Sequence, residues 1–99
     1  MSKLVRDLIP DVIPEEKRSL YRFTELDPSD YRKRLKEKLL EEVEEFFAAE
    51  NSEEIADIYE VLDALMKDLG IEKSEALKIQ QEKKLKRGGF EKKLLMETL

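Results

Sequence analysis

The spacing of hydrophobic residues divides the chain near residue 27. Residues 1–26 show no helical periodicity, because Pro10 and Pro14 interrupt the apolar positions and residues 19–26 alternate between polar and apolar side chains. We expect an irregular arm there, with a short extended segment. From residue 28 onward, apolar residues recur every three or four positions, as is typical of amphipathic helices.

Capping residues predict two helices joined by a tight turn. Asp27 can cap the first helix and Pro28 suits its first turn, so we expect this helix over residues 28–50. Ser52 can cap the second helix, and Gly70 supplies its end. The short connection predicts that the two helices form a hairpin.

A third helix is predicted beyond the hairpin. It begins near Ser74, ends at Gly88–Gly89 and carries few apolar residues on a surface rich in lysine and glutamine. A short tail follows, and the sequence contains no linker long enough to separate domains. The sequence therefore predicts an all-α fold in which residues 1–99 form a single domain: a helical hairpin plus a third helix in a bundle, with an irregular N-terminal arm.

Composition narrows the classes of function. Of the 99 residues 43% are charged, but none is cysteine or histidine, which excludes thiol chemistry, imidazole catalysis and metal sites built on those residues. Any metal must therefore bind to oxygen atoms. The net charge of -5 argues against a nucleic-acid partner. A chain this short buries a modest fraction of its surface, so dimerisation is expected to help it.

Negative charge is concentrated in residues 41–57, which contain seven glutamates, one aspartate and no basic residue. Successive residues of a helix are about 100° apart, which places Glu42 inside the apolar stripe of the first helix, between Leu35 and Phe46. Glu45 lies at one edge of the same stripe. A carboxylate inside the apolar stripe is less typical of a solvated helix face than the exposed glutamates around it.

The second helix carries a matching pair of acids. Glu54 lies at the margin of its apolar stripe and Asp57 follows one turn later, so both pairs are expected to converge near the connected end of the hairpin. Crowded carboxylates need a counter-charge, and Mg²⁺ prefers oxygen ligands. One interpretation is a Mg²⁺ site, with Mn²⁺ as a substitute. In the other, the acids are solvated and Glu42 pairs with Lys38, four residues earlier.

Positive charge is concentrated near the C-terminus, where residues 78–93 contain seven bases and two acids. Lys83, Lys86 and Arg87 precede Gly88–Gly89, whose backbone amides can approach an anion closely. These residues are interpreted either as a phosphate-binding segment or as the ordinary basic end of a helix that is capped by glycine.

Near the N-terminus, Arg6 and Asp7 lie between apolar neighbours in the stretch LVRDLIP. They are interpreted either as an ion pair that fixes the arm or, for Arg6, as a contact to substrate. Their charges also argue against a signal peptide or a membrane span in this stretch, so we expect a cytoplasmic protein.

Three motifs, in this order, resemble one protein superfamily. EE-x-x-E in EEVEE, followed by E-x-x-D in EIAD, is similar to the acidic signature of the MazG-type all-α nucleoside triphosphate pyrophosphohydrolases, which also include dimeric dUTPases and phosphoribosyl-ATP pyrophosphohydrolase. The opening KLVRDLIP and the closing KRGGF resemble a short branch of this group, so the similarity covers nearly the whole chain. One departure is visible. Only eight residues separate Glu45 from Glu54, fewer than in many relatives, which leaves less room for a nucleobase pocket.

This resemblance implies Mg²⁺-dependent hydrolysis of a nucleoside triphosphate between the α and β phosphates, which gives a monophosphate and pyrophosphate. A house-cleaning role on non-canonical nucleotides and a homodimer or homotetramer with sites near the subunit interface are also implied. The implied metal ligands are Glu42, Glu45, Glu54 and Asp57, the residues that orient water are Glu41 and Glu45, and those that bind phosphate are Lys83, Lys86, Arg87 and Arg6.

Two alternative functions stand beside this one. The first is a helical oligomerisation or regulatory module without catalytic activity, in which the acids only solvate helix faces. The second is a phosphoribosyl-ATP pyrophosphohydrolase, which keeps the reaction and changes the substrate.

Overall fold

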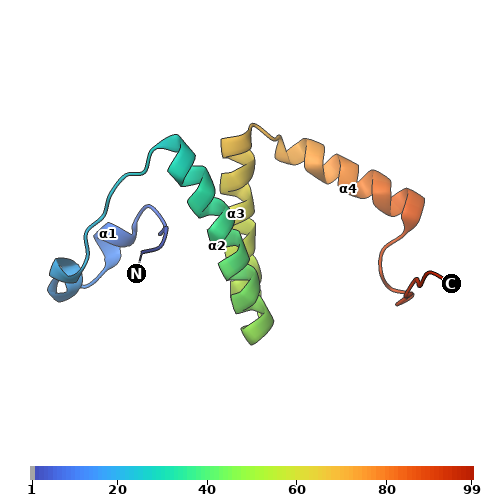
Figure 1. Cartoon of the computed structure of the whole chain (residues 1–99), viewed down its shortest axis with the longest axis horizontal. Helices are drawn as coiled ribbons and strands as arrows, with labels where there is room; N and C mark the ends of the chain where they lie inside the picture. The colour runs from blue at the N-terminus through green and yellow to red at the C-terminus, as the bar shows by residue number, and fades with distance from the viewer. Residues whose placement is uncertain (1) are drawn as a thin grey trace.

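The computed structural model describes residues 2–99 and consists of helices joined by irregular segments (Figure 1). In chain order these are α1 (Ile9–Val12), the 3₁₀ helix η1 (Glu15–Leu20), α2 (Pro28–Ala49), α3 (Ser52–Leu69) and α4 (Lys73–Arg87). The described residues contain no strand. The all-α prediction is confirmed, together with the hairpin, the further helix and the irregular N-terminal region.

Side-chain caps determine where the two long helices begin. Asp27 accepts a hydrogen bond from the backbone N–H of Asp30 at 2.8 Å, as expected for the N-cap of α2. The N-cap of α3 is Asn51, whose side chain accepts from the backbone N–H of Glu54 at 3.0 Å. The predicted cap Ser52 was therefore wrong by one residue, because Asn51 is the residue with extended backbone angles at the entry to the helix.

The core of the molecule lies between α2 and α3. The described residues bury three hydrophobic side chains, Leu35 from α2 and Val61 and Leu65 from α3. Half-buried neighbours extend this cluster: Leu4, Tyr31, Leu39 and Ala64. An ion pair of 2.7 Å between Arg32 and Asp68 joins the two helices at the open end of the hairpin. This is a small core for a chain of this length.

The helix α4 and the tail behind it extend away from the hairpin (Figure 1). Every residue from 71 to 99 is exposed, including Leu85 at 77% and Phe90 at 96%. The radius of gyration is 18.0 Å, compared with about 13 Å for a compact domain of 100 residues. The third helix was predicted correctly, but in the single chain it does not cover the hairpin.

The N-terminal arm lies to one side of the hairpin, with its first residues next to α2 and η1 farthest from it (Figure 1). Leu4 packs against the core, and the Ser2 hydroxyl accepts a hydrogen bond of 3.1 Å from Arg34 of α2. The predicted extended segment at residues 19–26 is only partly correct. Its first two residues belong to η1, while Tyr21 is extended without pairing to any strand in the described chain. Within that same part of the chain, no helix is long and apolar enough to span a membrane.

Candidate metal centre

The hairpin brings five acidic side chains together near its closed end. Glu41, Glu42 and Glu45 come from α2, whereas Glu54 and Asp57 come from the first half of α3. They form two overlapping groups, and Glu42 belongs to both of them. In each group, Glu41–Glu42–Glu45 and Glu42–Glu54–Asp57, the candidate ligand oxygens all lie within 4.8 Å of one another.

Glu42 is the buried member of this cluster. It is 5% exposed, and no other charged residue in the described part of the chain is buried to that degree. One of its oxygens, Oε1, forms an ion pair with Lys38 Nζ at 3.0 Å. The other, Oε2, is buried without a hydrogen-bond partner, and so is Oε2 of Glu54. Burying a charged oxygen without a hydrogen-bond partner destabilises the folded state by about 1–3 kcal/mol or more. Two such oxygens in one cluster are therefore best explained by a ligand that binds them.

Lys38 supplies part of the missing positive charge. Its ammonium lies 3.0 Å from Glu42 and 3.5 Å from Glu41, one turn along the same helix. Partial burial lowers the pKa of Lys38, but the hydrogen bond and the charge of Glu42, followed by those of Glu41, raise it above its ordinary value. The ion pair expected from the spacing of Lys38 and Glu42 is therefore present. It leaves the second oxygen of Glu42 without a partner.

Neighbouring negative charges affect the pKa of Glu45. Its pKa is raised above the ordinary value by the hydrogen-bond contact with Glu42, then by the charge of Glu42, with smaller contributions from Glu41 and Glu54. The side chain itself is exposed. The neighbouring acids therefore favour the protonated form of Glu45.

The stability of the protein in EDTA is expected to fall as the pH rises through the pKa of Glu45. That pKa is higher in the folded than in the unfolded chain, so its contribution is complete below the ordinary value of 4.5 and is lost above the folded value. Glu45→Gln should remove this part of the pH dependence and melt at a higher temperature than the unsubstituted protein at about pH 7.

Circular dichroism melting curves in EDTA at several pH values measure this effect. Glu44→Gln makes the same change of charge at an exposed position outside the cluster and serves as the control. If both substitutions changed the pH dependence of the melting temperature equally, the pKa of Glu45 would not be raised by its neighbours.

Arg6 connects the N-terminal arm to the cluster. Its guanidinium donates a hydrogen bond to Asp57 Oδ1 at 2.8 Å, across 51 positions of sequence. The interpretation in which Arg6 pairs with Asp7 is therefore wrong, since its partner lies on α3. The arm nonetheless contacts the hairpin through an arginine–aspartate pair, and that pair includes one of the candidate ligands.

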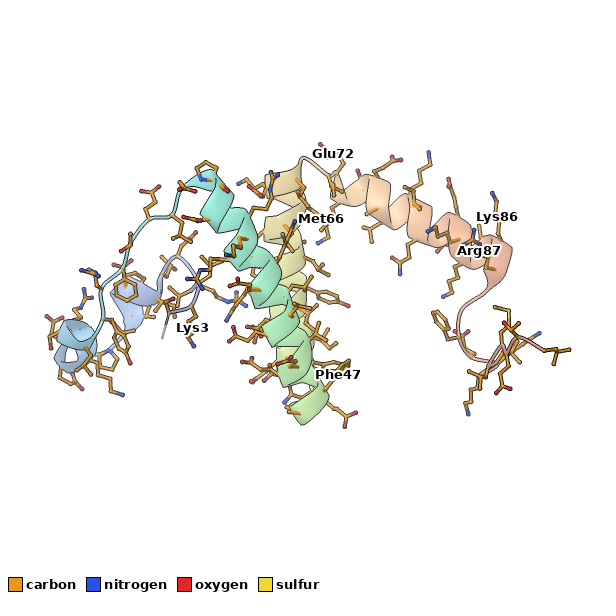
Figure 2. All side chains as sticks on the ribbon, viewed as in Figure 1. Lys3, Phe47, Met66, Glu72, Lys86 and Arg87 are labelled. Atoms are coloured by element: carbon orange, nitrogen blue, oxygen red, sulfur yellow. The ribbon has the colours of Figure 1, made fainter. Side chains whose placement is uncertain are left out.

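The basic residues near the C-terminus do not approach the carboxylates within the chain. Lys83, Lys86 and Arg87 lie on the exposed α4, and Figure 2 shows Lys86 and Arg87 at its far end, away from α2 and α3. Gly88, with a φ of 79°, donates its backbone N–H to the carbonyl of Lys84 at 2.8 Å. Capping of the helix by glycine is therefore present.

The donor set fits a hard divalent cation. It consists of carboxylate oxygens, and opposite ligands of one Mg²⁺ ion are about 4.2 Å apart, because each lies about 2.1 Å from the ion. The separations within each group, all within 4.8 Å, are compatible with oxygens that share one ion. A cation would stabilise Oε2 of Glu42 and Oε2 of Glu54 most, because these buried oxygens have no other partner.

Comparison with known proteins found no family model, no curated protein and no solved structure that matches this chain. The likeness to the MazG-type enzymes therefore rests on the motifs alone, and function is inferred from the geometry of the cluster.

Proposed function

We propose that the protein is a Mg²⁺-dependent nucleotide pyrophosphohydrolase of the cytoplasm that cleaves nucleoside triphosphates between the α and β phosphates. The observation that carries this proposal is the unpartnered Oε2 of the buried Glu42, in a group of acids supplied by two helices. A solvated helix face would not bury a carboxylate in this way.

The acids divide the chemical work between them. Mg²⁺ held by Glu42, Glu45, Glu54 and Asp57 would offset the negative charge of the phosphates. Glu45, the exposed member of the first acidic group, accepts the proton of the attacking water. Glu41 helps to orient the same water, but its carboxylate is also paired with Lys38 at 3.5 Å and is therefore less mobile. The water oxygen bonds to the α phosphorus, the bond from that phosphorus to the bridging oxygen breaks, and pyrophosphate leaves.

Phosphate binding is proposed to involve a second copy of the chain, in a homodimer or homotetramer. The hairpin, residues 28–69, contains thirteen acidic and six basic residues, whereas residues 70–99 contain eight basic and five acidic ones. Exposed apolar side chains occur on both parts, including Phe47 at 71% on the hairpin and Leu85 at 77% on α4. The C-terminal arm of one copy thus matches the hairpin of another in charge and apolar character.

That arrangement would also complete the site. Lys86 and Arg87 lie too far along α4 to reach the carboxylates of their own chain (Figure 2), but docking on a second copy would bring them, together with Lys83 of the same helix, beside that copy's cluster. The additional buried surface would support a chain whose described residues bury only three hydrophobic side chains.

The reaction is tested with a panel of canonical and modified nucleoside triphosphates together with phosphoribosyl-ATP. We expect pyrophosphate release that requires Mg²⁺, is supported by Mn²⁺ and stops in EDTA. The substrate with the highest kcat/KM separates a house-cleaning enzyme from a phosphoribosyl-ATP pyrophosphohydrolase. If no compound releases pyrophosphate and millimolar Mg²⁺ leaves the melting temperature unchanged, the protein is a non-catalytic helical module.

A further inference from the structure

Two basic side chains reach the acidic cluster, and they are held very differently. Lys38 lies within α2, between two glutamates of its own helix, with its side chain 20% exposed. Arg6 comes from the irregular arm, and its side chain is 59% exposed while it contacts Asp57. Lys38 is therefore a fixed part of the cluster, whereas Arg6 can leave it without moving a helix.

The contact of Arg6 falls on a candidate metal ligand. Asp57 belongs to the group formed with Glu42 and Glu54, both of which have a buried oxygen without a partner. A guanidinium on Asp57 places a positive charge next to the position where these three carboxylates would hold a cation. Arg6 and a divalent cation therefore have a common target.

We propose that Arg6 competes with the divalent cation for Asp57, and that cation binding releases its guanidinium to the phosphate of the substrate. This inference rests on the proposed function and adds to it a link between metal binding and substrate binding. The remaining contacts of the arm, made by Leu4 and Ser2, keep Arg6 at the edge of the cluster after it leaves Asp57. Only the side chain has to move.

Exposure decides between displacement and simultaneous binding. Both members of the ion pair are substantially exposed, 59% for the Arg6 side chain and 40% for that of Asp57, so their attraction is weak. A dication a few ångströms away repels the guanidinium twice as strongly as a monovalent ion would. In the opposing model, Arg6 does not compete with the cation but holds the Asp57 carboxylate in the orientation that binds it. That model predicts weaker cation binding when Arg6 is removed.

Direct binding of Mn²⁺, without nucleotide, tests the proposal. Free Mn²⁺ is measured by electron paramagnetic resonance during titration of the unsubstituted protein and of Arg6→Gln. We expect Arg6→Gln to bind Mn²⁺ about two- to fivefold more tightly, which corresponds to the loss of an exposed competing ion pair. The affinity for a nucleotide in the presence of saturating Mg²⁺ should fall in the same variant.

Lys3→Gln is the matched control, because it removes one positive charge from the same arm. Lys3 lines a small cavity of about 40 Å³ together with Lys38 and Glu41, yet it forms no ion pair among the described residues. We expect its Mn²⁺ affinity to be unchanged. Equal tightening in Lys3→Gln and Arg6→Gln would overturn the proposal in favour of a general effect of net charge.

A measurement on the unsubstituted protein avoids any effect of substitution on folding. The ¹⁵N NMR signal of Arg6 Nε, assigned from the spectrum of Arg6→Lys, should shift during a Mg²⁺ titration with the midpoint of cation binding. A signal that stays in place while the cation binds would overturn the displacement of Arg6, as would weaker Mn²⁺ binding by Arg6→Gln. Failure of the unsubstituted protein to bind Mn²⁺ at all would instead remove the proposed function itself.

Discussion

Replacing Glu42 by glutamine is expected to abolish the stabilisation by Mg²⁺ and to slow pyrophosphate release by about 100-fold or more, while the hairpin stays folded. Glutamine keeps the size of the buried side chain, and its amide oxygen can still accept from Lys38. What it loses is the charge of the oxygen that has no partner in the cluster. The metal centre should therefore fail while the packing around Leu35 survives.

Melting temperatures with and without Mg²⁺, together with the rate of pyrophosphate release, measure this effect. Without Mg²⁺, Glu42→Gln should melt at the same or a higher temperature than the unsubstituted protein, because the repulsion from Glu45 and the burial of a charge are removed. Glu44→Gln, an exposed neighbour outside both acidic groups, should retain full activity. Normal Mg²⁺ binding and turnover by Glu42→Gln would reject it as a ligand.

Two inactive variants, Glu42→Gln and Arg87→Gln, are expected to restore activity when they are refolded together. If each site uses the carboxylates of one copy and the arm of another, a mixed dimer contains one site with both residues intact. Random pairing makes half of the dimers mixed, so about a quarter of the unsubstituted activity should return. The effect is large because each variant alone is nearly inactive.

The experiment needs a control for sites that lie within one chain. A mixture of Glu42→Gln with Asp57→Asn removes two ligands from the same cluster and should stay inactive, because mixed dimers then repair neither site unless the ligands themselves come from two copies. Analytical ultracentrifugation of the unsubstituted protein gives the oligomeric state directly. No recovery by the Glu42→Gln and Arg87→Gln pair would contradict a phosphate site shared between copies.

Local patterns were sufficient for the helices and for the inward position of one acid. The start of α2 follows from Asp27 and Pro28 and the end of α3 from Gly70, whose effects act within one helical turn. The burial of Glu42 follows from its place in the apolar stripe, since helical geometry converts spacing into direction. The error at the start of α3 arose because Asn51 and Ser52 are both good caps, and only backbone angles distinguish them.

Contacts between distant segments could not be obtained in that way. Arg6 lies 51 positions from Asp57, and nothing in the local pattern of the arm selects α3 as its partner rather than the adjacent Asp7. The position of α4 away from the hairpin could not be predicted from the sequence either. Its few apolar residues are compatible with packing inside the chain or against another copy.

Which segments are helical and which acids share a face can be derived from the amino-acid order, because those properties depend on residues within a few positions of one another. Which oxygens lack a partner, and which basic residue contacts their group, became known from the packing of the folded chain. Those properties depend on how α2, α3 and the arm meet in space, where burial removes water and leaves each charge to the neighbours that the fold supplies.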